Sequence, residues 1–286
     1  MHQSIIDLYD RFTHGGMTRR AFFDRLVVLT GGTLAANAAI ILLQNDYAKA
    51  ETVPESDARI KTENLSFDVG RGTKMDGYLA KPANGTAFPT VIVIHENRGL
   101  NPHIKDVTRR LAVAGFMAFG VDLLTPLGGT PSDEDKARDM IGQLKSADVT
   151  GWLKGVDAAL RQRPDCNGKV GVVGFCWGGG AVNQLAVNDP QLNAAVAYYG
   201  KQPDAAQVPS IKAPLLLHYG ALDQGMDAGI PAFEAALKAN NKNYKIYVYD
   251  GANHAFNNDT NAARYNKAAA DLAWGRTIDF LKQNLA

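Results

Sequence analysis

The stretch Gly174-Phe175-Cys176-Trp177-Gly178-Gly179-Gly180 decides how the rest of this chain is interpreted. Its first five residues match the nucleophile-elbow pattern G-x-S-x-G, with cysteine in place of serine. A β-branched run at residues 169–173 precedes the motif, and a helix-compatible run at 181–187 follows it. Because the motif requires a strand, a tight turn and a helix in that order, the sequence predicts this arrangement around Cys176.

The residues beside the cysteine are small, as such a turn needs. A nucleophile at the tip of the turn has a strained backbone, and Gly174 and Gly178 avoid a clash with it. The turn also leaves the first amides of the following helix unpaired and directed at the site, where they lower the pKa of a thiol and can donate to an oxyanion. Taken alone, the motif also fits an inert buried cysteine in a glycine-rich loop.

The composition indicates one large globular domain with an N-terminal appendage. The chain has 286 residues, of which 46% are hydrophobic, enough for one large core. Its 30 basic and 29 acidic residues leave a net charge of +1 without a basic stripe, so nucleic-acid binding has little support. The strand between Cys166 and Cys176 spans about 20 Å, whereas a disulfide tolerates about 7 Å between Cα atoms, so we expect two free thiols.

The first fifty residues have a composition of their own. Arg19 and Arg20 precede a mostly apolar stretch at 26–43, and Ala48-Lys49-Ala50 offers a small-x-small cleavage site. That order resembles a twin-arginine signal, which implies a periplasmic or secreted protein that meets a membrane only during export. The alternative for residues 1–50 is a helical arm packed on the domain or on a partner subunit, in a cytoplasmic protein. Polar residues dilute the apolar stretch below a convincing membrane span.

A polar linker at residues 51–64 leads into the predicted catalytic domain, residues 65–286. Eight runs predict its strands: 65–69, 75–81, 90–95, 117–121, 169–173, 193–199, 215–219 and 244–249. The first two flank Gly70-Arg71-Gly72 and predict an antiparallel hairpin. Helical segments alternate with the later strands, which predicts an α/β fold with a mostly parallel eight-stranded sheet flanked by helices and a site at its carboxyl edge.

A thiol nucleophile needs a base, and the base needs an orienting acid, which in this arrangement follow in the order nucleophile, acid, histidine. Asp223 directly follows the strand at 215–219, and His254 follows the last strand. Both loops therefore lie at the same edge of the sheet as Cys176. Asp227 and Asp250 are rival acids, but Asp250 lies too close to the end of its own strand to reach behind a histidine four residues on.

The other histidines lack such a context. His95 and His218 end strands and are expected to be structural, while His2, His14 and His103 have no partner pattern. The sequence contains no metal-ligand cluster, nucleotide loop or flavin signature. We therefore expect no metal and no cofactor.

Together these motifs resemble those of the dienelactone hydrolase family, carboxymethylenebutenolidase-like enzymes of the α/β-hydrolase superfamily. The resemblance covers residues 65–285 and rests on the elbow, on His95-Glu96-Asn97-Arg98-Gly99, on Asp223 and on His254-Ala255-Phe256. It implies the α/β-hydrolase fold. It also implies that the leader belongs to an exported branch of the family.

The resemblance assigns roles to five further residues. In relatives the residue matching Glu96 pairs with the resting thiol and takes part in its activation, since a neighbouring carboxylate opposes thiolate formation. The backbone amides of Trp177 and Asn97 are the expected oxyanion donors. Arg264 falls where relatives bind the substrate carboxylate. A second family arginine has no counterpart here, and Arg98 is the candidate substitute.

These residues predict a hydrolase of lactones or activated esters that acts through Cys176, His254 and Asp223 and a thioester acyl-enzyme. A thiolate readily leaves the tetrahedral intermediate, so attack is productive mainly when the departing alcohol is also stabilised, as an enol is. The expected partner is a small-molecule lactone or ester, and the sequence indicates neither its identity nor the oligomeric state. The alternative is a non-hydrolytic redox-sensing or ligand-binding protein in which Cys176 is a reversible thiol.

Overall fold

The computed structural model describes residues 1–70 and 72–286, so Arg71 of the predicted hairpin turn lies outside the described residues. Its eight strands are β1 (Ile60–Asp68), β2 (Lys74–Pro82), β3 (Phe88–Ile94), β4 (Met117–Val121), β5 (Cys166–Phe175), β6 (Ala194–Tyr198), β7 (Leu215–Gly220) and β8 (Tyr244–Tyr249). They form one sheet in the order β1-β2-β4-β3-β5-β6-β7-β8. The pairs β1–β2 and β2–β4 are antiparallel and the others are parallel, which confirms the predicted mostly parallel sheet.

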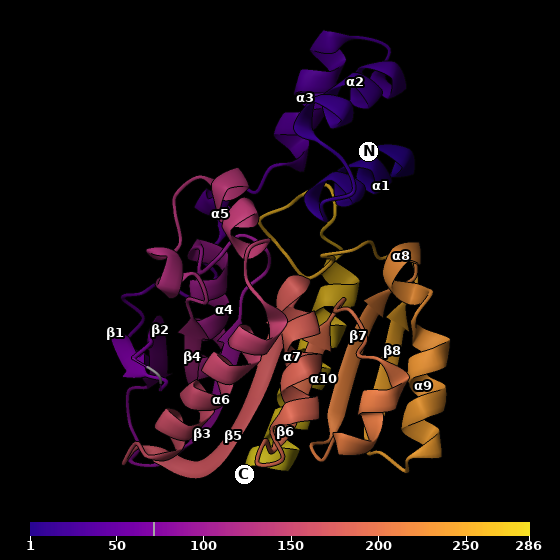
Figure 1. Ribbon diagram of the computed structural model, residues 1–286. Coiled ribbons are helices and arrows are strands. Elements are labelled where there is room, and N and C mark those ends of the chain that lie inside the picture. Colours follow the sequence, from indigo (N-terminus) through magenta and orange to yellow (C-terminus); the bar gives the residue numbers. More distant parts are fainter. Residues whose placement is uncertain (71) are drawn as a thin grey trace.

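Helices cover both faces of this sheet (Figure 1). Those of the main domain are α4 (Pro102–Val113), α5 (Glu134–Ile141), α6 (Ser146–Arg161), α7 (Trp177–Asn188), α8 (Gln224–Asp227), α9 (Ile230–Ala239) and α10 (Lys267–Leu285). Short 3₁₀ turns are η1 (Tyr47–Lys49), η2 (Thr125–Leu127) and η3 (Ala205–Ser210). Because β3 to β8 are parallel, their carboxyl ends meet at one edge, where the loops carry Cys176 and His254.

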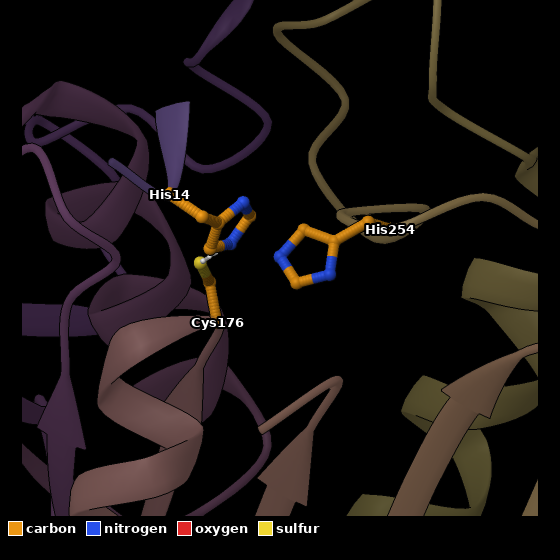
Figure 2. A group of neighbouring side chains, drawn as sticks. All are labelled: His14, Cys176 and His254. Carbon is orange, nitrogen blue, oxygen red and sulfur yellow. Dashed lines mark hydrogen bonds between the residues drawn. The ribbon is translucent and has the colours of Figure 1, made fainter. Parts of the chain in front are cut away.

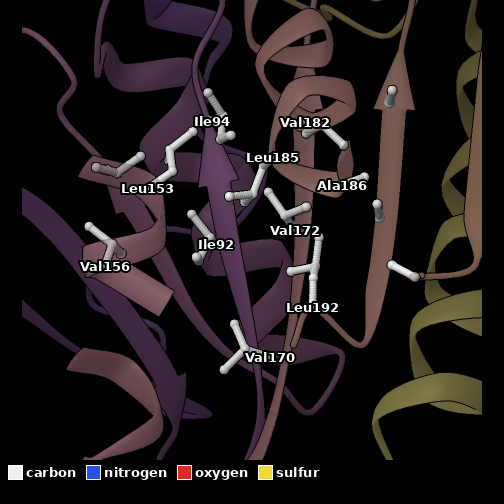
Figure 3. Packing of buried hydrophobic residues seen from close by; sticks show 14 of the residues in the cluster. Ile92, Ile94, Leu153, Val156, Val170, Val172, Val182, Leu185, Ala186 and Leu192 are labelled. Atoms are coloured by element: carbon white, nitrogen blue, oxygen red, sulfur yellow. The ribbon is translucent and has the colours of Figure 1, made fainter. Parts of the chain in front are cut away.

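The core divides into two layers because side chains alternate along each strand. On β3, Ile92 and Ile94 belong to the layer that includes residues of α6, α7 and α9, and Figure 3 shows them beside the first two of these helices. Val91 and Val93 belong to the opposite layer, with α4 and α10. All four side chains are fully buried, as expected of a central strand covered on both faces.

The edge strand β1 is longer than predicted. It begins at Ile60, where it pairs with Pro82 of β2, and not at residue 65. The sequence pattern did not indicate a strand at these positions because the residues there are polar. An edge strand of an antiparallel pair leaves one face in water and can carry such residues. The predicted linker therefore contributes its last residues to the sheet.

The first fifty residues form three helices, α1 (Gln3–Thr13), α2 (Arg19–Thr30) and α3 (Thr33–Leu43), which stand beyond the carboxyl edge of the sheet (Figure 1). We call residues 1–50 the arm. Gly31, in a left-handed conformation with φ 77°, ends α2. Among the described residues no single helix is long and apolar enough to cross a membrane. The pair formed by α2 and residues 33–49 has the length and composition of a membrane span, but the two segments are bent by 112° relative to each other.

The arm has a small core of its own and is fastened to the loop after β8. Phe12 and Phe22 stack with ring centroids 4.6 Å apart, and Leu26 and Leu43 are fully buried beside them. Two of the hydrogen bonds between the arm and the main domain reach this loop: Asp46 N–H donates to Thr260 O at 2.8 Å, and Asn261 Nδ2 donates to Leu43 O at 2.7 Å. These contacts hold the arm over the carboxyl edge.

Replacing Gly178 with alanine tests the packing at the start of α7. The new Cβ would lie 2.4 Å from His95 O, so we expect the free energy of unfolding to fall by about 1–3 kcal/mol in urea titrations. Gly275→Ala is the control, because its Cβ meets no atom within 4 Å on α10 and alanine favours a helix by up to about 1 kcal/mol. Equal effects of the two substitutions would contradict this view of the packing.

Candidate active site

Cys176 occupies the predicted turn between β5 and α7. Its backbone has φ 54° and ψ −118°, a conformation that costs about 1–3 kcal/mol for a residue with a side chain. The turn is closed by glycine, since a Cβ on Gly174 would lie 2.4 Å from Gly178 O. The predicted strand, turn and helix are confirmed, and the thiol is presented at the helix N-terminus.

The loop after β3 lies against the start of α7. The His95 ring stacks on Trp177 with centroids 5.5 Å apart, and Leu123 N–H donates to His95 Nε2 at 3.3 Å. His95 is thus structural, as predicted. The same packing places the loop that carries Asn97 beside the first turn of α7. The backbone amides of Asn97 and Trp177, which are the expected oxyanion donors, lie in these two neighbouring segments. Within the described residues no acceptor binds the Asn97 backbone N–H.

Asp223 and His254 meet at the carboxyl edge. His254 Nδ1 lies 2.5 Å from Asp223 Oδ2, and Met226 N–H donates to the other carboxylate oxygen at 3.4 Å. Burial raises the pKa of the Asp223 carboxyl, but the charge of His254 and the hydrogen bonds from His254 and Met226 together outweigh burial, so the pKa is lowered overall. Asp223, and not Asp227 or Asp250, is therefore the partner of His254, in agreement with the prediction.

His14 contacts the thiol, which the sequence did not predict. Its Nε2 lies 3.3 Å from Cys176 Sγ, while its Nδ1 lies 2.7 Å from Asp10 O (Figure 2). The His14 and His254 rings are edge to face with centroids 4.6 Å apart. The expectation that His14 has no partner is wrong, because α1 brings it across the carboxyl edge.

The two imidazoles change the ionisation of the thiol. Burial raises the pKa of Cys176, but the positive charges of His254 and His14 outweigh burial and bring the pKa to about 6. Burial in turn lowers the pKa of both histidines. The thiolate charge and the hydrogen bonds of each ring, together with the Asp223 charge at His254, outweigh burial, so both pKa values are raised. At neutral pH the site therefore favours a thiolate beside imidazolium.

Glu96 has a different neighbour from the one that the family resemblance implies. Its Oε2 accepts a hydrogen bond from Asn258 Nδ2 at 2.8 Å, and its Oε1 is buried without a partner among the described residues. His14 occupies the position next to the thiol that was expected for Glu96. Glu96 still lines the same small cavity as Cys176.

Both candidate substrate-binding arginines line this cavity, but each also has a partner. Arg264 NH1 donates to Asp10 Oδ1 at 2.8 Å, and its Nε is buried without an acceptor among the described residues. Arg98 donates to Tyr9 OH and Glu134 O, both at 3.3 Å. Arg264 is buried and does not face solvent, because Asp10 of the arm covers it.

The space at the thiol is closed. The cavity lined by Cys176, His254, Glu96 and both arginines has a volume of about 10 Å³, room for about one water. A larger cavity of about 890 Å³ lies between the arm and Arg98, but Cys176 does not line it. Since ligand pockets usually hold about 300–1,000 Å³, the thiol has no room for a substrate while the arm lies in this position.

Comparison with known proteins identifies the family. The model of the dienelactone hydrolase family matches residues 75–285, nearly the whole main domain. The chain belongs to the dienelactone hydrolase family. The α/β-hydrolase fold and the assignment as a carboxylic ester hydrolase follow from this membership. A second model, described as YqhI-like, matches residues 1–29.

Individual relatives agree with the family. A protein of Escherichia coli K12 named as a carboxymethylenebutenolidase is 33% identical over 230 residues, which are 74% of this chain and 84% of the relative. A Bradyrhizobium protein named as a 2-oxo-3-(5-oxofuran-2-ylidene)propanoate lactonase is 32% identical and covers 78% of this chain and 97% of its own length. A Klebsiella pneumoniae structure titled as a dienelactone hydrolase has a TM-score of 0.70 and 31% identity, and covers 78% of this chain and 99% of its own.

Four site residues that the sequence did not reveal come from the arm. Tyr9, Asp10, Thr13 and His14 approach the site from α1, with Asn97 Nδ2 donating to Thr13 O at 2.8 Å. A helix could have been predicted there, because apolar residues recur at helical spacing along residues 5–12. No spacing in the sequence indicates where such a helix docks.

The ionisation of Cys176 gives a direct test. Thiolate absorption in the ultraviolet, measured as the difference between the native protein and Cys176→Ser, should be half developed near pH 6, compared with about 8.5 for an ordinary cysteine. Because the His14 charge lowers the pKa of the thiol, His14→Ala should move the midpoint to higher pH. Cys166→Ser is the control and should leave the midpoint unchanged. A midpoint above pH 8 in the native protein would contradict the assignment.

Proposed function

We propose that this protein hydrolyses enol lactones and similarly activated esters, with Cys176 as nucleophile, His254 as base and Asp223 as the residue that orients it. The observation that supports this most directly is a thiol at a strained elbow beside an imidazole whose other nitrogen is bound to a buried carboxylate. Nucleophile, base and orienting acid in that relation are the parts that acyl transfer requires. The family membership supports the same class of reaction.

In the first step the Cys176 thiolate attacks the lactone carbonyl carbon. The new S–C bond forms as the C=O π pair moves to oxygen, and the backbone amides of Trp177 and Asn97 stabilise the oxyanion. When the carbonyl re-forms, the ring C–O bond breaks and the enolate leaves with a proton from His254. The product of this step is an open-chain thioester on Cys176.

In the second step water hydrolyses the thioester. His254 takes a proton from water, the hydroxide attacks the thioester carbonyl, and the S–C bond breaks to release the carboxylic acid and the thiolate. Asp223 holds the His254 ring and favours its protonated form in both steps. The overall reaction consumes one lactone and one water and yields one carboxylic acid with an enol, which tautomerises to a ketone.

We further propose that the substrate carries a carboxylate bound by Arg264. Support comes from the buried guanidinium at the edge of the site, whose Nε has no acceptor among the described residues, and from its pairing with a carboxylate of the chain itself, Asp10. A guanidinium binds carboxylates through paired donors, so a substrate carboxylate could replace that of Asp10. The Bradyrhizobium relative is named for a lactone that contains a propanoate group. Arg98 is the candidate second contact.

Cys176→Ala should abolish turnover of an enol lactone, because no other nucleophile lies at the elbow. With the native protein, rapid quenching followed by mass spectrometry should find the acyl group on Cys176 and not on Cys166. The matched control Cys166→Ser should retain turnover. Undiminished activity of Cys176→Ala would contradict the proposal, and peroxide-reversible modification of Cys176 without any acyl adduct would favour the redox-sensing alternative.

Arg264→Gln should raise KM for a carboxylate-bearing enol lactone by about tenfold or more, the usual loss when a charged hydrogen bond is removed. Steady-state kinetics with a neutral lactone of the same ring provide the control, for which KM should change little.

The matched variant Asp10→Asn should act in the opposite direction. It removes the charge that competes for Arg264, and therefore KM for the anionic lactone should fall. A parallel change in KM for both lactones in Arg264→Gln would show that the arginine supports the fold and does not bind the substrate carboxylate.

For localisation we propose export by the twin-arginine route. Support comes from the exposed Arg19 and Arg20 at the start of α2, from the apolar helices that follow and from the small-x-small sequence at residues 48–50. Cleavage there would remove Asp10 and His14 from the site, whereas an uncleaved arm keeps it closed. The N-terminus of the mature protein distinguishes the two forms.

A further inference from the structure

We propose that His14, Cys176 and His254 form a binding site for Zn²⁺ that holds the arm closed over the catalytic thiol. One ligand atom from each residue lies within 4.8 Å of the other two, and Figure 2 shows the His14 ring next to the sulfur with the His254 ring beside it. The inference concerns binding, and it does not require that the protein hydrolyse lactones.

In each histidine the Nδ1 atom already has an oxygen partner. His14 Nδ1 is held by Asp10 O at 2.7 Å, and His254 Nδ1 by Asp223 Oδ2 at 2.5 Å. Each Nε2 is therefore the nitrogen available to a metal: that of His14 lies 3.3 Å from Cys176 Sγ, and that of His254 is buried with no hydrogen-bond partner among the described residues. A histidine whose second nitrogen bonds a carbonyl or carboxylate is the usual form of a zinc-binding histidine.

The ligand set fits a borderline-soft cation. Two imidazoles and a thiolate suit Zn²⁺, whereas Mg²⁺ and Ca²⁺ require oxygen ligands. Around a tetrahedral zinc, with bonds of about 2.3 Å to sulfur and about 2.0–2.1 Å to nitrogen, the ligand atoms lie about 3.3–3.6 Å apart. The upper end of this range applies to a sulfur and a nitrogen, and the 3.3 Å between His14 Nε2 and Cys176 Sγ is close to it. All three residues line the small cavity, which has room for about one water as a fourth ligand.

Occupation of this site has two consequences. The metal takes the lone pairs of Cys176 and His254 that hydrolysis would use, and the protons held by these groups are released to solvent. The metal also joins His14 of α1 to the main domain, in addition to the pair between Asp10 and Arg264. Zn²⁺ would thus stabilise the closed arrangement. Because His14 remains partly exposed, the cation can enter from solvent.

The test measures Zn²⁺ binding to the full-length, chelator-treated protein by competition with a chromogenic chelator. The native protein should bind one equivalent, and His14→Ala should bind it at least about 100-fold more weakly, since even the loss of an outer partner of a ligand costs about 10–100-fold. His2→Ala, which removes another histidine of the same arm, and Cys166→Ser, which removes the other thiol, are the matched controls and should bind as tightly as the native protein. Excess Mg²⁺ should not compete.

Cobalt provides an independent readout of the same ligands. Co²⁺ should give thiolate-to-metal charge-transfer absorption in the native protein, none in Cys176→Ser, and an altered spectrum in His14→Ala. Circular dichroism of each variant shows whether it is folded. Equal Zn²⁺ affinity of native protein and His14→Ala, or the absence of the charge-transfer band, would overturn the proposal. Hydrolysis by Cys176→Ala would overturn the proposed mechanism while leaving the measured zinc site intact, so the two failures are distinguishable.

Discussion

The backbone at Cys176 is the constraint on which the rest of the site depends. A φ of 54° is unfavourable for cysteine, and it persists because β5, α7 and the loop after β3 are packed too closely for any other path of the chain. The closeness is measured at Gly178, where a single added carbon would reach 2.4 Å from His95 O. The same packing therefore fixes the direction of the thiol, the orientation of the first amides of α7 and the position of residues 95–99.

Electrostatics around the thiol follow from this geometry. Cys176 is buried, which alone would keep it protonated, but two imidazoles stand beside it and reverse the effect. Each ring is oriented by an oxygen behind it, Asp223 for His254 and the Asp10 carbonyl for His14. The arrangement that makes a thiol nucleophilic is also the arrangement that makes three good ligands for a soft cation, so the proposed chemistry and the proposed metal site compete for the same lone pairs.

The arm covers the carboxyl edge of the sheet where the thiol lies. Asp10 places a carboxylate on Arg264, where the proposed substrate would place its own, and His14 covers the sulfur. Many of the contacts between the arm and the main domain are polar and come from the end of α1 and from residues 43–47, while the small apolar core of the arm is largely separate from the main one. Such an attachment can open without disturbing the sheet, since the two cores of the main domain contain no residue of the arm.

Much of this protein was determined by the sequence alone. β-forming runs predicted all eight strands and a mostly parallel sheet, and the elbow, Asp223 and His254 were placed at one edge because parallel strands end together. These features are local patterns or follow from one rule of topology. The environment of Arg264, the partner of Glu96 and the position of His14 were decided by the tertiary structure only. His14 and Cys176 are 162 positions apart, and their contact depends on how α1 docks, a property of packed surfaces that no spacing in the chain records.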